Sequence, residues 1–254
     1  LVYYAVFTNL TLLVSSLFKK SSLAFVALLV LWMVACLATP KLSTNLAQKL
    51  YSYPTQLEFE EQIAQAKSSG LNGHEPWSDA AKKLEAETLK QYGVDSISQL
   101  PFNWDGFLMQ KGDEHEAQIY FEHYDLLKKT NAKQSQVYQY TSALSPFLPT
   151  RFLSMALCRT DYSSHWAFAD AAEKYRLLLV GKMNGDMVDN SKTGDWDYLA
   201  DEKLWTSVPE FEYTPPTYAS VLSENKGNIS LLALWLMGTF ALVIFQVNKM
   251  KVVS

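Results

Sequence analysis

The densest group of potential metal ligands lies between positions 113 and 123. It comprises Asp113, Glu114, His115, Glu116, Glu122 and His123. His115-Glu116 begins like the zinc-binding sequence HExxH, but Ile119 stands where the second histidine would be. A metal ion needs several converging ligands, and one helix offers only His115 and His123 from a single face. We therefore expect a solvated charged face here, with no metal and no cofactor.

Nucleophilic chemistry has a similarly weak basis. Cys158 lies near Asp161 and His165 in the sequence, but no GxSxG motif accompanies them. The chain also has neither a P-loop nor a GxGxxG motif. We assign no catalytic residue and expect the protein not to be an enzyme. Any energy from ATP would have to come from a partner.

Three uncharged apolar segments frame the chain. They are 1–18, 23–39 (which ends at Pro40) and 229–247. A bilayer core is crossed by about 20 helical residues, and backbone groups in lipid must be satisfied within the helix. We therefore expect three membrane spans, a hairpin within 1–39 and a closing span at 229–247.

The charged residues give these spans an orientation. Lys19 and Lys20 lie between the first two spans, and Lys249 and Lys251 follow the third. By the positive-inside rule both sites are cytoplasmic, including a tail at 248–254. All 26 Asp and Glu fall within 40–228, with 18 Lys and Arg. The resulting net charge of −8 argues against a nucleic-acid partner, and we expect 40–228 to be an extracytoplasmic domain.

Helix signals run through most of this middle region. Thr55 and Glu58 form a capping box, and Ser78 and Gly93 bracket a helix at 79–92. A long helix is expected at 105–144, with a kink at Gly112, and another at 164–187. The region 147–157 is a short apolar stretch, and 208–216 is extended. The predicted fold is an all-α membrane protein with a mainly helical extracytoplasmic domain.

Within this domain we single out structural residues only. Pro146 and Arg151 mark the junction after the long helix. A polar cluster around the last helix is predicted from Asp161, Glu173, Tyr175, Arg176, Asn184 and Asp186. Glu173 and Arg176 are three residues apart on a helix and can form an ion pair.

Several stretches together resemble a known family. They are KSS (20–22), PKL (40–42), NLA (45–47), GHEP (73–76), YGVDS (92–96), LPFNWDG (100–106), LSP (144–146), RFLSMAL (151–157), TD (160–161), AEKYR (172–176), NGDM (184–187), GDW (194–196) and 205–216. In their order and spacing, the chain resembles the C-terminal half of bacterial type-2 ABC transporter permeases that carry a large extracytoplasmic domain of unknown function. One departure is Arg159, where the family pattern leads us to expect a small residue.

The resemblance implies a permease with about six spans, of which the last three are present. The first span, an outer loop and the next two spans would lie upstream of Leu1, together with the cytoplasmic loop that docks on the ATPase. The implied partners are an ABC ATPase, a second permease subunit in a homo- or heterodimer, the bilayer and a periplasmic protein. The implied location is the bacterial cytoplasmic (inner) membrane.

We therefore expect a multi-pass permease subunit of an ABC-type exporter, powered by a separate ATPase. The alternative is a membrane-anchored extracytoplasmic interaction or scaffold module without a transport pathway. Small residues in the spans permit close helix packing under either interpretation.

Overall fold

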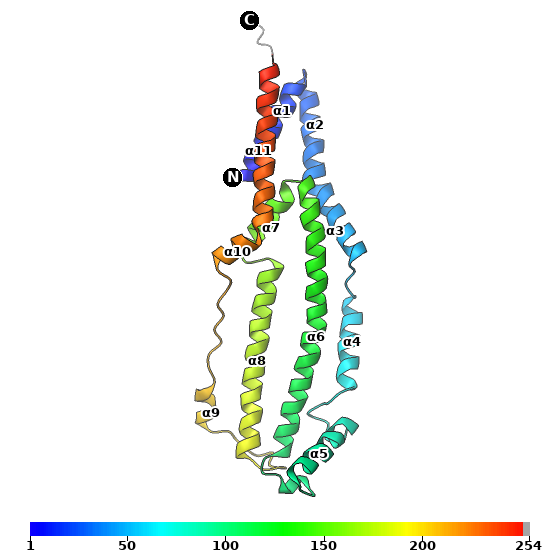
Figure 1. The fold of residues 1–254 in the computed structure, drawn as a ribbon, viewed down its shortest axis with the longest axis vertical. Coiled ribbons are helices and arrows are strands. Elements are labelled where there is room, and N and C mark those ends of the chain that lie inside the picture. Colours follow the sequence, from blue (N-terminus) through cyan, green and yellow to red (C-terminus); the bar gives the residue numbers. More distant parts are fainter. Residues whose placement is uncertain (251–254) are drawn as a thin grey trace. The chain divides into compact units, whose positions relative to one another are not determined.

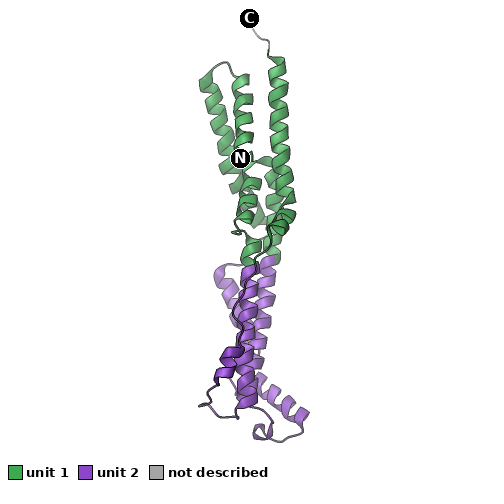
Figure 2. Cartoon of the chain, turned by 90° about the vertical axis from the view of Figure 1, so that its left-hand side faces the viewer, with its two compact units in different colours: residues 1–53, 129–166, 215–254 green, residues 54–128, 167–214 purple. Residues whose placement is uncertain are grey.

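The computed structural model describes residues 1–250, and within that range it is helical, without strands. Lys251, one of the basic residues used above to orient the chain, and the rest of 251–254 lie outside the described residues. Figure 1 labels the helices along the chain, which divides into two compact units (Figure 2). Unit 1 comprises 1–53, 129–166 and 215–254, and unit 2 comprises 54–128 and 167–214.

The helices follow one another through both units. Their bounds are α1 Val2–Leu17, α2 Ser21–Met33, the π-helical turn η1 Val34–Ala38, α3 Thr39–Leu50, α4 Gln56–Ser68, α5 Asp79–Tyr92, α6 Trp104–Thr141, α7 Phe147–Leu157, α8 Tyr162–Asn190, α9 Glu202–Ser207, α10 Tyr218–Glu224 and α11 Lys226–Lys249. Short 3₁₀ turns are η2 at Ile97–Gln99 and η3 at Ser142–Leu144.

Two helices of unit 1 are long and apolar enough to cross a membrane. They are Ser21–Leu50, which joins α2, η1 and α3 over 30 residues, and α11 with 24 residues. The first expected span forms a shorter apolar helix, α1, of 16 residues. α1 packs against α2 and α11, burying Val6 and Leu10. The helix that begins at Ser21 continues beyond Pro40, where we expected the second span to end.

Unit 2 contains the helix caps read from the sequence. Thr55 Oγ1 accepts a hydrogen bond from Glu58 N (3.2 Å), and Glu58 Oε2 accepts one from Thr55 N (2.8 Å). Hydrogen bonds from Thr55 lower the pKa of Glu58, and the bond from the backbone N–H has a larger effect than the bond from the hydroxyl. Ser78 Oγ accepts from Ala81 N at 3.2 Å, and Gly93 closes α5 with a left-handed φ of 67°. Both arms of the predicted capping box are thus confirmed.

The helix at 147–157 was not foreseen. α7 contains Pro149, which usually argues against a helix. Because α7 begins at Phe147, Pro149 lies in the first turn, where backbone N–H groups have no partner within the helix. The other long helices lie near their expected positions: α6 ends at Thr141 before η3, and α8 extends slightly beyond 164–187 at both ends.

Arg159, the departure from the family pattern, adopts a left-handed backbone conformation with φ 57°. It follows the C-cap of α7, and Thr160 N donates to Met155 O at 2.9 Å, as in a Schellman motif. Glycine is favoured at such a position because it has no Cβ. Here the arginine side chain has contacts of its own: Nη2 donates to Pro216 O (3.2 Å), and the guanidinium lies 4.8 Å from the Tyr218 ring centroid.

Gly112, where we expected a kink in the long helix, lies inside α6. α6 passes through it as one helix, and the loop at 70–73 lies directly against it. A Cβ added to Gly112 would come within 2.3 Å of Gly73 N and 2.6 Å of Gly73 Cα. The glycine therefore permits two stretches of backbone to touch.

We expect Gly112→Ala to destabilise unit 2 by about 1–3 kcal/mol, because the clash is with backbone atoms that cannot rotate away. The measurement is amide hydrogen exchange along α6 in the full chain. The matched control is Gly181→Ala in α8, where an added Cβ meets nothing within 4 Å and should be neutral or stabilising. Equal exchange rates in the two variants would contradict this role.

Candidate functional site

A π-helical turn, η1, lies where the candidate membrane helix approaches Pro40. In η1 the hydrogen bonds span five residues, and Thr39 N donates to Val34 O. With the same spacing, the next bond of the turn would join the N–H of residue 40 to Ala35 O. Proline has no N–H, so the Ala35 carbonyl is left without a donor from its own helix.

Ser145 supplies the missing donor. Its hydroxyl donates to Ala35 O at 2.6 Å and accepts from Phe147 N at 3.1 Å. Ser145 has no exposed surface, and the adjacent Pro146 is also fully buried. A single hydroxyl thus joins the candidate membrane helix to the first turn of α7.

An apolar cavity of about 590 Å³ adjoins this junction. It is lined by nine apolar residues from α1, α2, η1, η3, α11 and the turn before α7, among them Leu10, Leu31, Ala35, Leu144, Pro146 and Trp235. Ligand sites of this size usually add a few polar groups that fix the ligand's orientation. This lining has no charged, amide or hydroxyl side chain, so it suits an apolar chain or ring and offers no nucleophile for covalent chemistry.

Polar side chains in the flanking helices are paired with one another. Asn9 Nδ2 donates to Thr239 Oγ1 at 3.2 Å, joining α1 to α11. The Tyr3 hydroxyl and the buried Cys36 thiol lie 3.5 Å apart. Such pairs are typical of helices that associate in an apolar medium.

The residues selected from the sequence in unit 1 have separate places. Pro146 lines the cavity and is buried, whereas Arg151 is exposed on α7. Asp161 precedes α8, and its Oδ1 accepts from Ser164 N at 3.3 Å. Of these three residues, only Pro146 belongs to the candidate site.

The selected residues of unit 2 do not converge on one another. Glu173 and Arg176 form the expected pair, with two hydrogen bonds of 2.9 and 2.8 Å that raise the pKa of Arg176. Tyr175 packs against Phe211, with ring centroids 5.3 Å apart. Asn184 donates to Asp113 Oδ2 at 2.7 Å instead.

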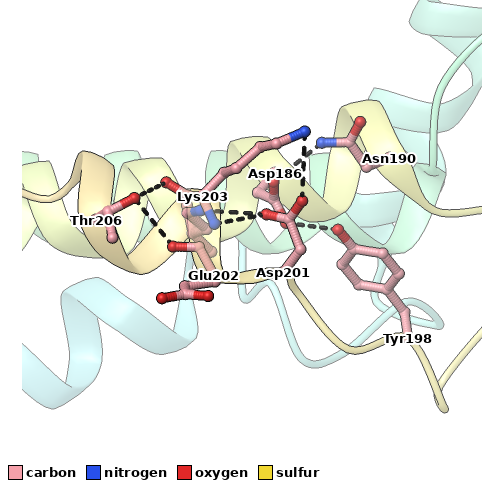
Figure 3. A network of polar contacts seen from close by, with 8 residues as sticks. Asp186, Asn190, Tyr198, Asp201, Glu202, Lys203 and Thr206 are labelled. Carbon is pink, nitrogen blue, oxygen red and sulfur yellow. Dashed lines mark hydrogen bonds and ion pairs between the residues drawn. The ribbon is translucent and has the colours of Figure 1, made fainter.

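Asp186 anchors the segment that follows α8 (Figure 3). Its carboxylate accepts from Asn190 Nδ2 at 2.9 Å and from the Tyr198 hydroxyl at 2.6 Å. The hydrogen bond to Asp186 raises the pKa of Tyr198 to about 12. In the same view, Asp201 caps α9 by accepting from Lys203 N at 2.9 Å.

Sequence reasoning missed Asn103, which is fully buried in unit 2. Its side-chain NH₂ donates to Ser191 Oγ (2.6 Å) and Lys192 O (2.9 Å), and its Oδ1 accepts from Asp105 N (2.8 Å) and Gly106 N (3.2 Å). One side chain therefore caps α6 and binds the two residues that directly follow α8. The sequence does contain one indication of this role, because asparagine is a favoured N-cap residue and Asn103 directly precedes the helix that begins at Trp104.

No group of three or more His, Cys, Asp or Glu within residues 1–250 is arranged to hold a metal ion. The dense stretch on α6 is used for other contacts: Glu116 pairs with Lys67 at 2.7 Å, and a His123 ring nitrogen lies 2.8 Å from Ile119 O.

Residues 56–214 match the model of a protein family described as a domain of unknown function, DUF3526. No curated protein and no solved structure matches the chain.

We expect Ser145→Ala to lower the stability of the full chain by roughly 1–3 kcal/mol, because the buried Ala35 carbonyl loses its donor. The measurement is thermal unfolding in detergent. Ser154→Ala on the exposed face of α7 serves as control, and its stability should stay within about 0.5 kcal/mol of the parent. If both variants unfold together, the junction does not depend on this bond.

The Tyr198–Asp186 bond should make stability depend on pH in the alkaline range. Since the pKa of Tyr198 rises from 10.0 to about 12 on folding, the bond stabilises the fold below pH 10 and its contribution is lost as pH passes 12. Ultraviolet titration of the parent minus that of Tyr198→Phe should show the ionisation of one phenol near pH 12. In Asp186→Asn that signal should move toward 10.0, and an unmoved signal would contradict the assignment.

Proposed function

The chain belongs to the family of the DUF3526 domain, and from that premise we propose that it is a membrane-spanning permease subunit of an ABC-type exporter, powered by a separate ATPase. The observation that carries this proposal is the apolar cavity lined by α1 together with residues of the two candidate membrane helices. A subunit that moves an apolar or bulky molecule needs such a space between its helices, whereas a simple anchor does not.

In this proposal α1 crosses the bilayer together with the two longer candidate helices, which gives three spans. α1 has 16 residues, slightly fewer than the usual 17–25, and its packing against α2 and α11 supports a common orientation. Lys19, Lys20 and Lys249 would face the cytoplasm of a bacterial cell, and 40–228 would lie on the other side of the inner membrane.

The distribution of acids supports placing unit 2 in water. It holds 24 of the 26 Asp and Glu residues and has a formal net charge of −13. Carboxylates are costly in the hydrocarbon region, so a unit this acidic belongs outside it. An ATPase and a second permease subunit would complete the transporter, because the sequence has no phosphate-binding loop of its own.

The second candidate is a membrane-anchored interaction or scaffold module. It is favoured by exposed tryptophans in unit 2: Trp77, Trp196 and Trp205 are 69, 72 and 57 % exposed. Tryptophan is enriched at protein interfaces. In this alternative the helices of unit 1 would only tether unit 2.

Filling the cavity separates the two functions. Leu31 lines the cavity. In the full-length complex reconstituted in nanodiscs, we expect Leu31→Trp to abolish the stimulation of the ATPase subunit by the permease. The subunits should still co-purify. Leu29→Trp on the exposed face of the same helix should leave hydrolysis unchanged. The permease assignment fails if no ATPase co-purifies with the parent protein, or if both variants hydrolyse ATP like the parent.

A further inference from the structure

The two units differ sharply in charge. Unit 1 has eleven basic and two acidic residues, whereas unit 2 has eleven basic and 24 acidic residues. The ion pairs seen within residues 1–250 all join residues of unit 2. The lysines of unit 1 therefore have few carboxylates available to neutralise them.

α3 arranges its residues in three lengthwise stripes, because residues four apart share a helix face. One stripe is buried, one is basic and polar, and one is leucine. They are Thr39, Ser43 and Ala47; Lys41, Asn45 and Lys49; and Leu42, Leu46 and Leu50. The leucines are 66, 44 and 56 % exposed, and both lysines are exposed.

The buried stripe needs no further partner. Thr39 Oγ1 donates to Val34 O at 2.9 Å, and Ser43 Oγ donates to Thr39 O at 2.7 Å. The unpartnered part of α3 is consequently the adjoining leucine and lysine face, which is apolar along one edge and cationic along the other.

The position of α3 on its helix indicates what covers this face. From Ser21 to Pro40 the helix has 20 residues without a charge, which matches the thickness of a bilayer core. The first charge is Lys41, and the helix continues to Leu50. α3 therefore follows a core-length segment without a break, at the depth where lipid headgroups begin.

We propose that α3 binds anionic phospholipids, with Lys41 and Lys49 contacting headgroup phosphates and Leu42, at the end of the leucine stripe nearest the bilayer core, contacting the acyl chains. The inference rests on the proposed membrane insertion of this helix. Lysine reaches headgroups by extending its stem along apolar surface, and interfacial helices combine these two stripes. Lys133, whose Nζ lies 5.7 Å from the Tyr51 ring centroid, adds a third cation at the end of α3.

The test uses the full chain in nanodiscs that contain phosphatidylcholine and phosphatidylglycerol, with native mass spectrometry of the lipids retained by the protein. The parent should retain phosphatidylglycerol preferentially. In Lys41→Gln/Lys49→Gln the preference should fall by about fivefold per lysine removed. It should persist in Lys41→Arg/Lys49→Arg, which keeps the charge, and in Lys83→Gln/Lys90→Gln on α5, which removes two exposed lysines of unit 2.

Three outcomes would overturn the proposal: no preference in the parent, a preference that the double glutamine variant retains, or displacement of the lipid by inorganic phosphate. The last would assign the lysines to free phosphate. Membrane insertion is measured separately, as resistance of the protein to alkaline extraction from vesicles. A protein that is not inserted can therefore be distinguished from an inserted protein without lipid preference.

Discussion

Unit 1 depends on a hydrogen bond that the chain cannot make with its own backbone. Pro40 interrupts the ladder of a helix that is otherwise apolar enough to cross a membrane, and the Ser145 hydroxyl replaces the absent N–H. Because Ser145 lies immediately before α7, the repair also fixes where α7 begins. Ala35, whose carbonyl is satisfied, and Pro146, next to Ser145, both line the cavity.

Unit 2 follows the same principle. Asn103 caps α6 by accepting from two backbone N–H groups, and its side-chain NH₂ donates to Ser191 and Lys192, which directly follow α8. Buried polar atoms are tolerated when each finds a partner, and they then specify one arrangement of neighbouring helices. In both units a short polar side chain before a helix holds a distant segment, while apolar packing supplies most of the buried surface.

Local sequence signals were sufficient for much of the helical structure. The capping box at Thr55 and the left-handed Gly93 predicted two helices correctly because caps act within a few residues. Pro40 was misleading: we expected the span to end there, but the helix continues, because the Ser145 hydroxyl satisfies the Ala35 carbonyl that Pro40 leaves without a donor. The purpose of Gly112 and the partners of Ser145 and Asn103 depend on segments far away in the sequence, which no local pattern reveals. The cavity likewise requires four stretches that are far apart in the sequence to meet.

The uneven distribution of carboxylates affects the water around unit 2. A body with a formal charge of −13 creates a negative potential that extends about 10 Å into a solution of moderate ionic strength. Cations, hydronium among them, accumulate in that layer and anions are depleted. The surface of unit 2 is thus more acidic than the surrounding bulk, and positively charged solutes reach it at a higher local concentration than negatively charged ones.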